Sequence, residues 1–226
     1  MVLTTRQGTP DPRQELAFGH ADVVAIVDAL LQHQDLALLK LARQAIISQD
    51  VLDDAYIRLL LGSGATKPMM KSARRIAAAG NRIAREPDLD LKGRRKGAVL
   101  ERLVNGLVRQ REAAEREAEI QLTRNPHTRR PWSRPKDVVV PLADPVEVYE
   151  CKFNGRWLEQ ADVDEMGDID LTARAGGGQS RACVAIMASK TTLDAVRPGL
   201  RLSEPLYFAE LDDLLDLRYL PPSRQM

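Results

Sequence analysis

An aspartate, a glutamate and a lysine recur within the segment from Asp137 to Lys152. Asp137 precedes three valines, and Glu150-Cys-Lys152 closes a second β-rich run, with a hairpin turn predicted at Ala143-Asp-Pro145 between them. Because side chains of a strand alternate between its faces, Glu150 and Lys152 share one face. A turn centred on residues 143 and 144 places Asp137 opposite Glu150 on that face, whereas a three-residue loop shifts the pairing by one.

Two carboxylates and a lysine on one sheet face have a definite chemical use. The carboxylates supply the hard oxygen ligands that Mg²⁺ prefers, and this ion keeps several waters. Bound Mg²⁺ polarises a phosphodiester and lowers the pKa of a coordinated water, while a lysine orients that water or offsets charge in the transition state. The alternative is an exposed strand on which Glu150 and Lys152 form a surface pair worth under about 1 kcal/mol.

Asp137, the valine run, the turn and Glu150-Cys-Lys152 together resemble the signature hairpin of the PD-(D/E)xK, restriction-endonuclease-like nucleases, and the resemblance covers about residues 93–215. That family also carries a glutamate on the helix before the sheet, often as Gly-x-x-x-Glu, and this chain has Gly97-Ala-Val-Leu-Glu101. The resemblance implies that Asp137 and Glu150 bind the metal and that Lys152 is the catalytic lysine. It further implies the carbonyl of Cys151 as a metal ligand and Glu101 as an accessory ligand.

Two features of the sequence qualify this match. Lys136 stands between Pro135 and Asp137, so the proline of the family name is displaced. The stretch from Pro87 to Lys92 (PDLDLK) fits the written motif more literally, but it is short, adjoins Gly93 and leaves no room for two strands. We therefore place the predicted site on the later segment.

Hydrophobic spacing predicts the elements that must position these residues. Residues 1–15 are polar and are predicted to be disordered, and residues 16–90 are predicted to form a small all-α module that ends in a linker at 86–93. Residues 91–226 are predicted to form an α/β domain with a restriction-endonuclease-like mixed-sheet core flanked by helices. Its long first helix has an apolar stripe at 99–108 and a charged end at 109–119. Strands are predicted near 120–122, 138–140, 146–153, 181–187 and 207–208, with a helix over 157–173 and a helical turn at 211–217.

The 226-residue chain has a net charge of +1, but its basic residues gather between Lys67 and Lys136. One acid-free stretch there supplies the predicted nucleic-acid contacts, which are Arg129, Arg130, Trp132, Arg134 and Lys136. Trp132 would stack on a base or anchor its loop, and a solvated helix face with a mobile loop would give the same charge pattern. The helical module is either a DNA reader or a dimerisation and packing module.

No apolar run approaches a membrane span and no signal peptide is visible, so we expect a cytoplasmic protein without a membrane partner. Cys151 and Cys183 are then core thiols, with a disulfide as the alternative. The sequence predicts a nuclease that uses Mg²⁺, or Mn²⁺ in its place. It favours DNA as the substrate and leaves RNA open, in defence, restriction or repair. It would act as a homodimer or in a larger complex formed through the helical module. The alternative is a catalytically silent binding or regulatory subunit that keeps the nuclease fold.

Overall fold

The structure of the protein is a computed structural model that describes residues 2–7, 11–48, 50–123, 136–141, 143, 145–154, 157–175, 179–188, 199–201 and 206–225. The chain forms two compact units. We call Asp11–Leu103 the helical unit, and Met1–Pro10 with Val104–Met226 the sheet unit. The sequence places a boundary near residue 90, whereas the units divide inside one continuous helix, α6 (Leu89–Val108).

The helical unit confirms that residues 16–90 are helical, as the sequence predicts. Each of three helices begins at an N-cap whose side chain accepts a backbone N–H. These caps are Asp35 before α3 (Leu36–Ile47), Asp53 before α4 (Asp54–Leu61) and Thr66 before α5 (Lys67–Ala84). Helices α3 and α5 pack at close range, because a Cβ on Gly80 would lie 2.5 Å from the Cβ of Ala45. The helices before α6 are α1 (Pro12–Phe18), α2 (Ala21–His33), α3 (Leu36–Ile47), α4 (Asp54–Leu61) and α5 (Lys67–Ala84).

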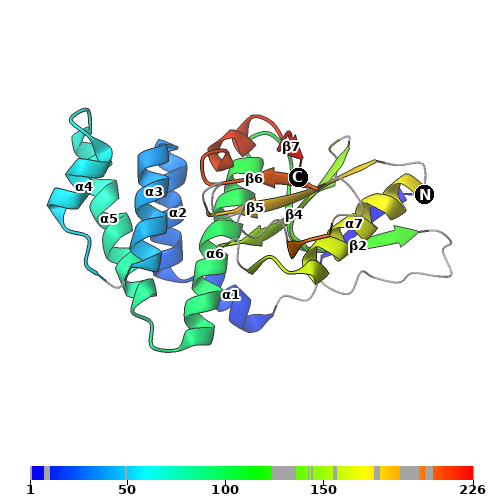
Figure 1. Cartoon of the computed structure of the whole chain (residues 1–226), viewed down its shortest axis with the longest axis horizontal. Helices are drawn as coiled ribbons and strands as arrows, with labels where there is room; N and C mark the ends of the chain where they lie inside the picture. Colours follow the sequence, from blue (N-terminus) through cyan, green and yellow to red (C-terminus); the bar gives the residue numbers. More distant parts are fainter. Residues whose placement is uncertain are drawn as a thin grey trace. The chain divides into compact units, whose positions relative to one another are not determined.

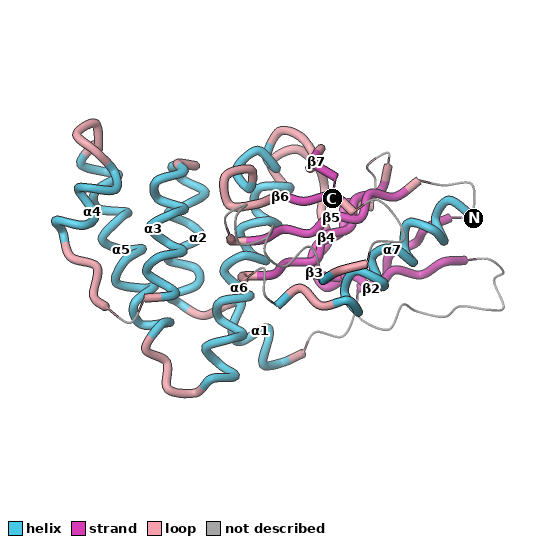
Figure 2. The backbone as a smooth tube through the Cα atoms, in the orientation of Figure 1, coloured by secondary structure: helices cyan, strands magenta, loops and turns pink. Residues whose placement is uncertain are grey.

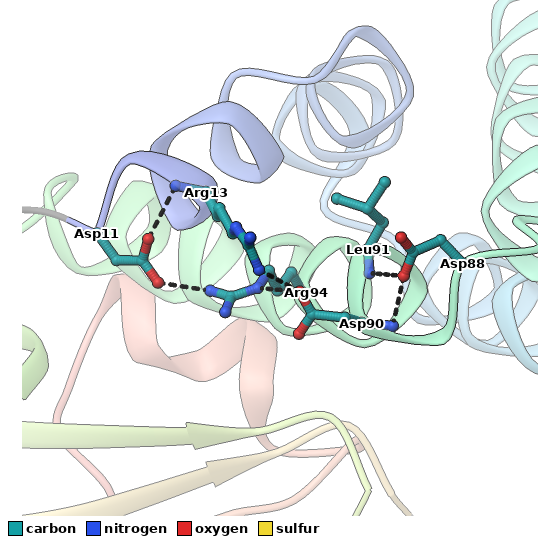
Figure 3. A network of polar contacts seen from close by, with 6 residues as sticks. All are labelled: Asp11, Arg13, Asp88, Asp90, Leu91 and Arg94. Carbon is teal, nitrogen blue, oxygen red and sulfur yellow. Dashed lines mark hydrogen bonds and ion pairs between the residues drawn. The ribbon is translucent and has the colours of Figure 1, made fainter.

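Most of the predicted linker at 86–93 is the first turn of α6, which corrects the prediction. The Asp88 carboxylate accepts hydrogen bonds from the backbone N–H groups of Asp90 and Leu91, at 2.9 and 3.1 Å, and thus supports the helix start (Figure 3). Arg94 pairs with Asp90 one turn earlier and with Asp11 at the start of α1. The PDLDLK stretch is therefore a helix start and not a hairpin. The charged tail predicted to prolong this helix is also wrong, since α6 ends at Val108 and a strand begins at Glu115.

Residues 1–15, predicted to be disordered, contain two elements. Strand β1 (Val2–Gln7) pairs antiparallel with β2 (Glu115–Thr123), and α1 begins at Pro12 with Asp11 as its side-chain cap. Polar composition predicted disorder because it shows little apolar surface, but a strand at a sheet edge gains backbone hydrogen bonds whatever its side chains are.

The sheet unit is built on a mixed sheet whose described strands lie side by side in chain order, from β1 to β7 (Figures 1 and 2). From β1 to β4 each neighbour is antiparallel, β4 pairs with β5 and β5 with β6 in parallel, and β7 returns antiparallel to β6. The predicted α/β class is confirmed at this level. The remaining elements are β3 (Lys136–Val140), β4 (Val146–Lys152), α7 (Gln160–Ala175), β5 (Ser180–Ile186), β6 (Tyr207–Ala209), the 3-10 helix η3 (Leu214–Arg218) and β7 (Arg224–Gln225).

Helix α7 connects the parallel strands β4 and β5 and covers one face of the sheet (Figure 2). Its apolar side chains recur every three or four residues, so they form one stripe that meets the sheet. The shared core contains Val163, Met166 and Ile169 from the helix and Val139, Val148, Ala182, Val184 and Ile186 from the strands. This packing brings the first turns of α7 over the ends of β3 and β4.

Candidate active site

The hairpin of β3 and β4 has the register that a turn centred on residues 143 and 144 predicts. Val138 pairs with Tyr149 and Val140 with Glu147, and the same antiparallel register continued by one residue sets Asp137 against Glu150. Val139 and Val148 face the core under α7, so alternation puts Asp137 and Glu150 on that same side. The predicted pairing of the two carboxylates is thereby confirmed.

Asp137 is fixed through the backbone of the neighbouring strand. Its Oδ2 accepts a hydrogen bond of 2.6 Å from the N–H of Cys151. The Cys151 side chain belongs to the other face of β4, and its thiol is free of any disulfide. Its predicted role as a carbonyl ligand stays a prediction, while its N–H has an observed role in orienting Asp137.

Lys152 lies between two carboxylates. Its Nζ is 2.9 Å from Glu150 Oε1 and 2.9 Å from Asp162 Oδ1. Asp162 in turn accepts a backbone hydrogen bond from Glu159 through Oδ2 at 3.0 Å, so the start of α7 fixes the carboxylate that holds the lysine. The ammonium group of Lys152 is thus directed toward Glu150 by a residue of the covering helix.

A second lysine, Lys136, completes the arrangement. Its side chain is only 1% exposed, and its Nζ lies 2.9 Å from Glu165 Oε2 and 3.8 Å from Glu150 Oε2. We call the six residues Asp137, Glu150, Asp162, Glu165, Lys136 and Lys152 the charged cluster. It contains four carboxylates and two ammonium groups, and therefore has a net charge of −2 when all six are ionised.

The negative charge of the cluster affects the pKa of Asp137. Burial first and the Glu150 carboxylate second raise the pKa of Asp137, while the Cys151 N–H and the two lysines lower it, and together they bring it to about 8. For Lys152, burial lowers the pKa, but the Glu150 and Asp162 carboxylates more than offset this and raise it above its usual value. Near neutral pH the metal-free cluster thus holds a proton on Asp137 and a full charge on Lys152.

The residues fit a hard divalent cation. Within the described parts of the chain, no group of three or more His, Cys, Asp or Glu side chains is placed to hold a metal. Mg²⁺ commonly uses only one or two carboxylates from the protein and completes its shell with water and phosphate oxygens. Asp137 and Glu150 are two such carboxylates on adjacent strands. A cation bound between them would replace the proton that Asp137 holds.

Two of the predicted site residues, Lys136 and Glu101, have surroundings that the sequence did not predict. Lys136, predicted as a surface contact to nucleic acid, is buried in the charged cluster, which corrects that prediction: the strand begins at Lys136 and draws its side chain under α7. Glu101 belongs to the helical unit, where it is 3% exposed and accepts a hydrogen bond of 3.0 Å from Gln14 Nε2. Its role as an accessory ligand stays a prediction. Arg129, Arg130, Trp132 and Arg134 lie outside the described residues.

The sequence interpretation missed Asp162 and Glu165. A signal was present, because a helix that connects two parallel strands packs across the sheet that they belong to. The first turns of the helix predicted after Lys152 hold Asp162, Asp164 and Glu165. The apolar stripe of that helix, extrapolated toward its start, leaves Asp162 and Glu165 beside the stripe and Asp164 on the exposed side.

A separate buried ion pair lies on the opposite face of β4. The Arg111 guanidinium donates to both carboxylate oxygens of Glu147, to the hydroxyl of Tyr149 at 3.1 Å and to the carbonyl of Leu217 at 2.9 Å. Glu147 and Tyr149 are 3% and 0% exposed. These contacts join the segment after α6 to β4 and to η3, so this cluster supports the strand that carries Glu150 and Lys152.

The chain matches no protein-family model, and no curated protein is significantly similar to it. Among solved structures it is similar to the crystal structure of protein VC1899 from Vibrio cholerae, with a TM-score of 0.41 and 17% sequence identity. That match covers 95% of this chain and 57% of the other, so the chain spans little more than half the length of that protein. In the described residues, we find no helix that is long and apolar enough to cross a membrane.

Proposed function

We propose that the sheet unit is a PD-(D/E)xK-like nuclease domain that hydrolyses phosphodiester bonds with Mg²⁺, and that its substrate is DNA. The observation that carries the proposal is the charged cluster, in which two adjacent carboxylates and a lysine face one side of the β3–β4 hairpin. The six side chains of this cluster have a net charge of −2 when all are ionised. A divalent cation would neutralise that charge. The order of a helix, three antiparallel strands, a crossover helix and a parallel strand also supports it.

Asp137 and Glu150 would hold the ion. Bound there, Mg²⁺ would polarise the phosphodiester and lower the pKa of a coordinated water. Asp137 must release its proton to bind, and the Cys151 N–H keeps its carboxylate in place meanwhile. Lys152, fully protonated, acts as a hydrogen-bond donor to a phosphate oxygen or to the attacking water and not as the base.

The remaining members of the charged cluster position these groups. Asp162 holds the Lys152 ammonium group, and the Glu165–Lys136 pair places a second positive charge 3.8 Å from Glu150. The charge on Lys136 offsets part of the repulsion between Glu150 and Asp137. Asp162 and Lys136 are therefore positioning residues that would not touch the reacting atoms.

One observation favours the catalytically silent alternative. Glu150 is already paired with both Lys152 and Lys136, so the hairpin has a set of ion pairs that stands without a metal. A domain that only binds nucleic acid would keep such pairs for stability. Metal-dependent cleavage separates the two functions.

The test is cleavage of plasmid, linear duplex, single-stranded DNA and RNA with Mg²⁺, Mn²⁺ or EDTA. We expect metal-dependent cutting of DNA that Asp137→Asn and Lys152→Met each reduce at least a hundred-fold. Asp164→Asn is the matched control, because it makes the same chemical change at an exposed position of α7. Equal cutting by wild type and both site variants would refute the assignment, and metal binding without cleavage of any substrate would favour the silent alternative.

A further inference from the structure

Helix α5 presents one cationic stripe to solvent. Its sequence from Lys67 to Ala84 has no acidic residue. At 100° per residue, its exposed basic positions, with Arg85 just after the helix, fall within a sector of roughly 100°. These positions are Lys67, Lys71, Arg74, Arg75, Arg82 and Arg85. Ala78, also exposed, is the only uncharged residue within the stripe after the first turn.

The opposite side of α5 explains why the stripe is fixed in direction. Buried Ala73, Ile76, Ala77, Gly80 and Ile83 pack toward the neighbouring helices, and α5 lies beside α3 and α2 (Figure 1). The close approach at Gly80 leaves no room for the helix to rotate about its axis. The backbone positions that carry the basic side chains therefore form a fixed row about 27 Å long at 1.5 Å per residue.

Local acids balance only part of this row. Arg74 pairs with Asp54 at 2.6 Å, and Arg82 pairs with Asp22 at 2.6 Å. Lys67, Lys71 and Arg75 have no ion-pair partner within the described part of the chain. Like charges one turn apart on a helix repel each other, so this arrangement costs free energy that a bound polyanion would recover.

A groove of about 720 Å³ lies at the N-terminal end of the stripe and adds a further cation. Its lining includes Arg58 from α4 together with Lys67 and Arg74. Leu59, which is 80% exposed, also lines the groove. The positive surface thus widens where α4 meets α5.

We propose that the outer face of α5 is a docking surface for the phosphate backbone of duplex DNA. Duplex DNA has one phosphate per strand every 3.4 Å, so a row about 27 Å long lies beside roughly eight base pairs. A row of lysines and arginines along one helix face suits contacts to phosphates, which carry no sequence information, so it would bind without regard to sequence. The choice of DNA as the polyanion rests on the proposed function. The charge and spacing of the stripe are observed independently of that function.

The test is the affinity of the full-length protein for a fluorescent 20-base-pair duplex, measured by anisotropy in EDTA across a range of salt concentrations. The triple variant Lys67→Gln, Lys71→Gln and Arg75→Gln should bind ten- to a hundred-fold more weakly. Its slope of log affinity against log salt should fall by about 2 to 3, because each phosphate contact contributes about 0.9. The charge-conserving variant Lys67→Arg, Lys71→Arg and Arg75→Lys should keep both affinity and slope.

The matched control removes three cations elsewhere: Arg13→Gln, Lys40→Gln and Arg201→Gln, at exposed positions outside the stripe. An equal loss in the control, or an unchanged slope in the α5 triple variant, overturns the proposal. Because EDTA prevents metal-dependent cleavage, the result is separate from the nuclease assay. If the protein binds DNA through α5 but never cuts it, the proposed function alone is refuted. If the α5 triple variant still cuts DNA and binds it as tightly as the wild type, the docking surface alone is refuted.

Discussion

Replacing Asp137 with asparagine should stabilise the metal-free protein at alkaline pH while removing its response to Mg²⁺. Asparagine has the shape of a protonated aspartate and can still accept the hydrogen bond from the Cys151 N–H. The pKa of Asp137 is raised from 3.8 to about 8 by burial and by Glu150, so the folded protein holds a proton that the unfolded chain releases. The wild type must therefore lose stability as the pH rises from about 4 to about 8.

The magnitude follows from the size of this shift. One pKa unit corresponds to about 1.4 kcal/mol, so a shift of roughly four units sets a ceiling of about 6 kcal/mol. The Asp137 side chain keeps partial exposure to solvent, so we expect about 2–3 kcal/mol after solvent screening. For a chain of this length that difference is a rise in Tm of about 5–10 °C for Asp137→Asn at pH 8.5.

The assay is thermal and urea unfolding of both proteins between pH 4.5 and pH 8.5 in EDTA, repeated at pH 8 with Mg²⁺. The two stabilities should converge at the acidic end and separate as the pH rises. Mg²⁺ at a hundred times its Kd should stabilise the wild type by about 2.7 kcal/mol and leave Asp137→Asn almost unchanged. A difference that does not vary with pH, or an equal response of both proteins to Mg²⁺, would refute the reasoning; Asp164→Asn should show neither effect.

Three further predictions concern buried contacts, each measured by urea unfolding. Glu165→Leu should lower the free energy of unfolding by about 3 kcal/mol, because it removes the carboxylate nearest to buried Lys136. The double variant Glu165→Leu with Lys136→Met should recover most of that loss. If the losses of the two single variants simply add, the reasoning is wrong. Arg111→Met should cost about 3–5 kcal/mol by leaving its carboxylate partner buried and unpaired, and a cost below about 1 kcal/mol would show that the pair is solvated. Gly80→Ala should cost about 1–3 kcal/mol through overlap with Ala45, and a neutral result would mean that α3 and α5 separate easily.

The sequence by itself determined the hairpin but left two registers open, and the structure has the one that sets Asp137 against Glu150. Alternation of side chains fixed the shared face of Glu150 and Lys152, because it depends only on neighbours along the chain. Helices with clear caps, such as the one that follows Thr66, were predictable for the same reason. Asp88 belongs to a stretch that fits the written nuclease motif, but in the structure its carboxylate accepts backbone hydrogen bonds at the start of α6.

Only the tertiary structure decided which groups surround the hairpin. Asp162 and Glu165 reach the lysines because α7 crosses the sheet at one angle and height, which depends on the packing of Met166 and its neighbours. The strand pairing of residues 2–7 likewise depends on a partner more than a hundred residues away. Lys136 illustrates the difference most plainly: it ends an acid-free basic stretch of the sequence, but its side chain contacts two half-buried carboxylates. Burial and charge partners arise from contacts between distant segments, and no local pattern records them.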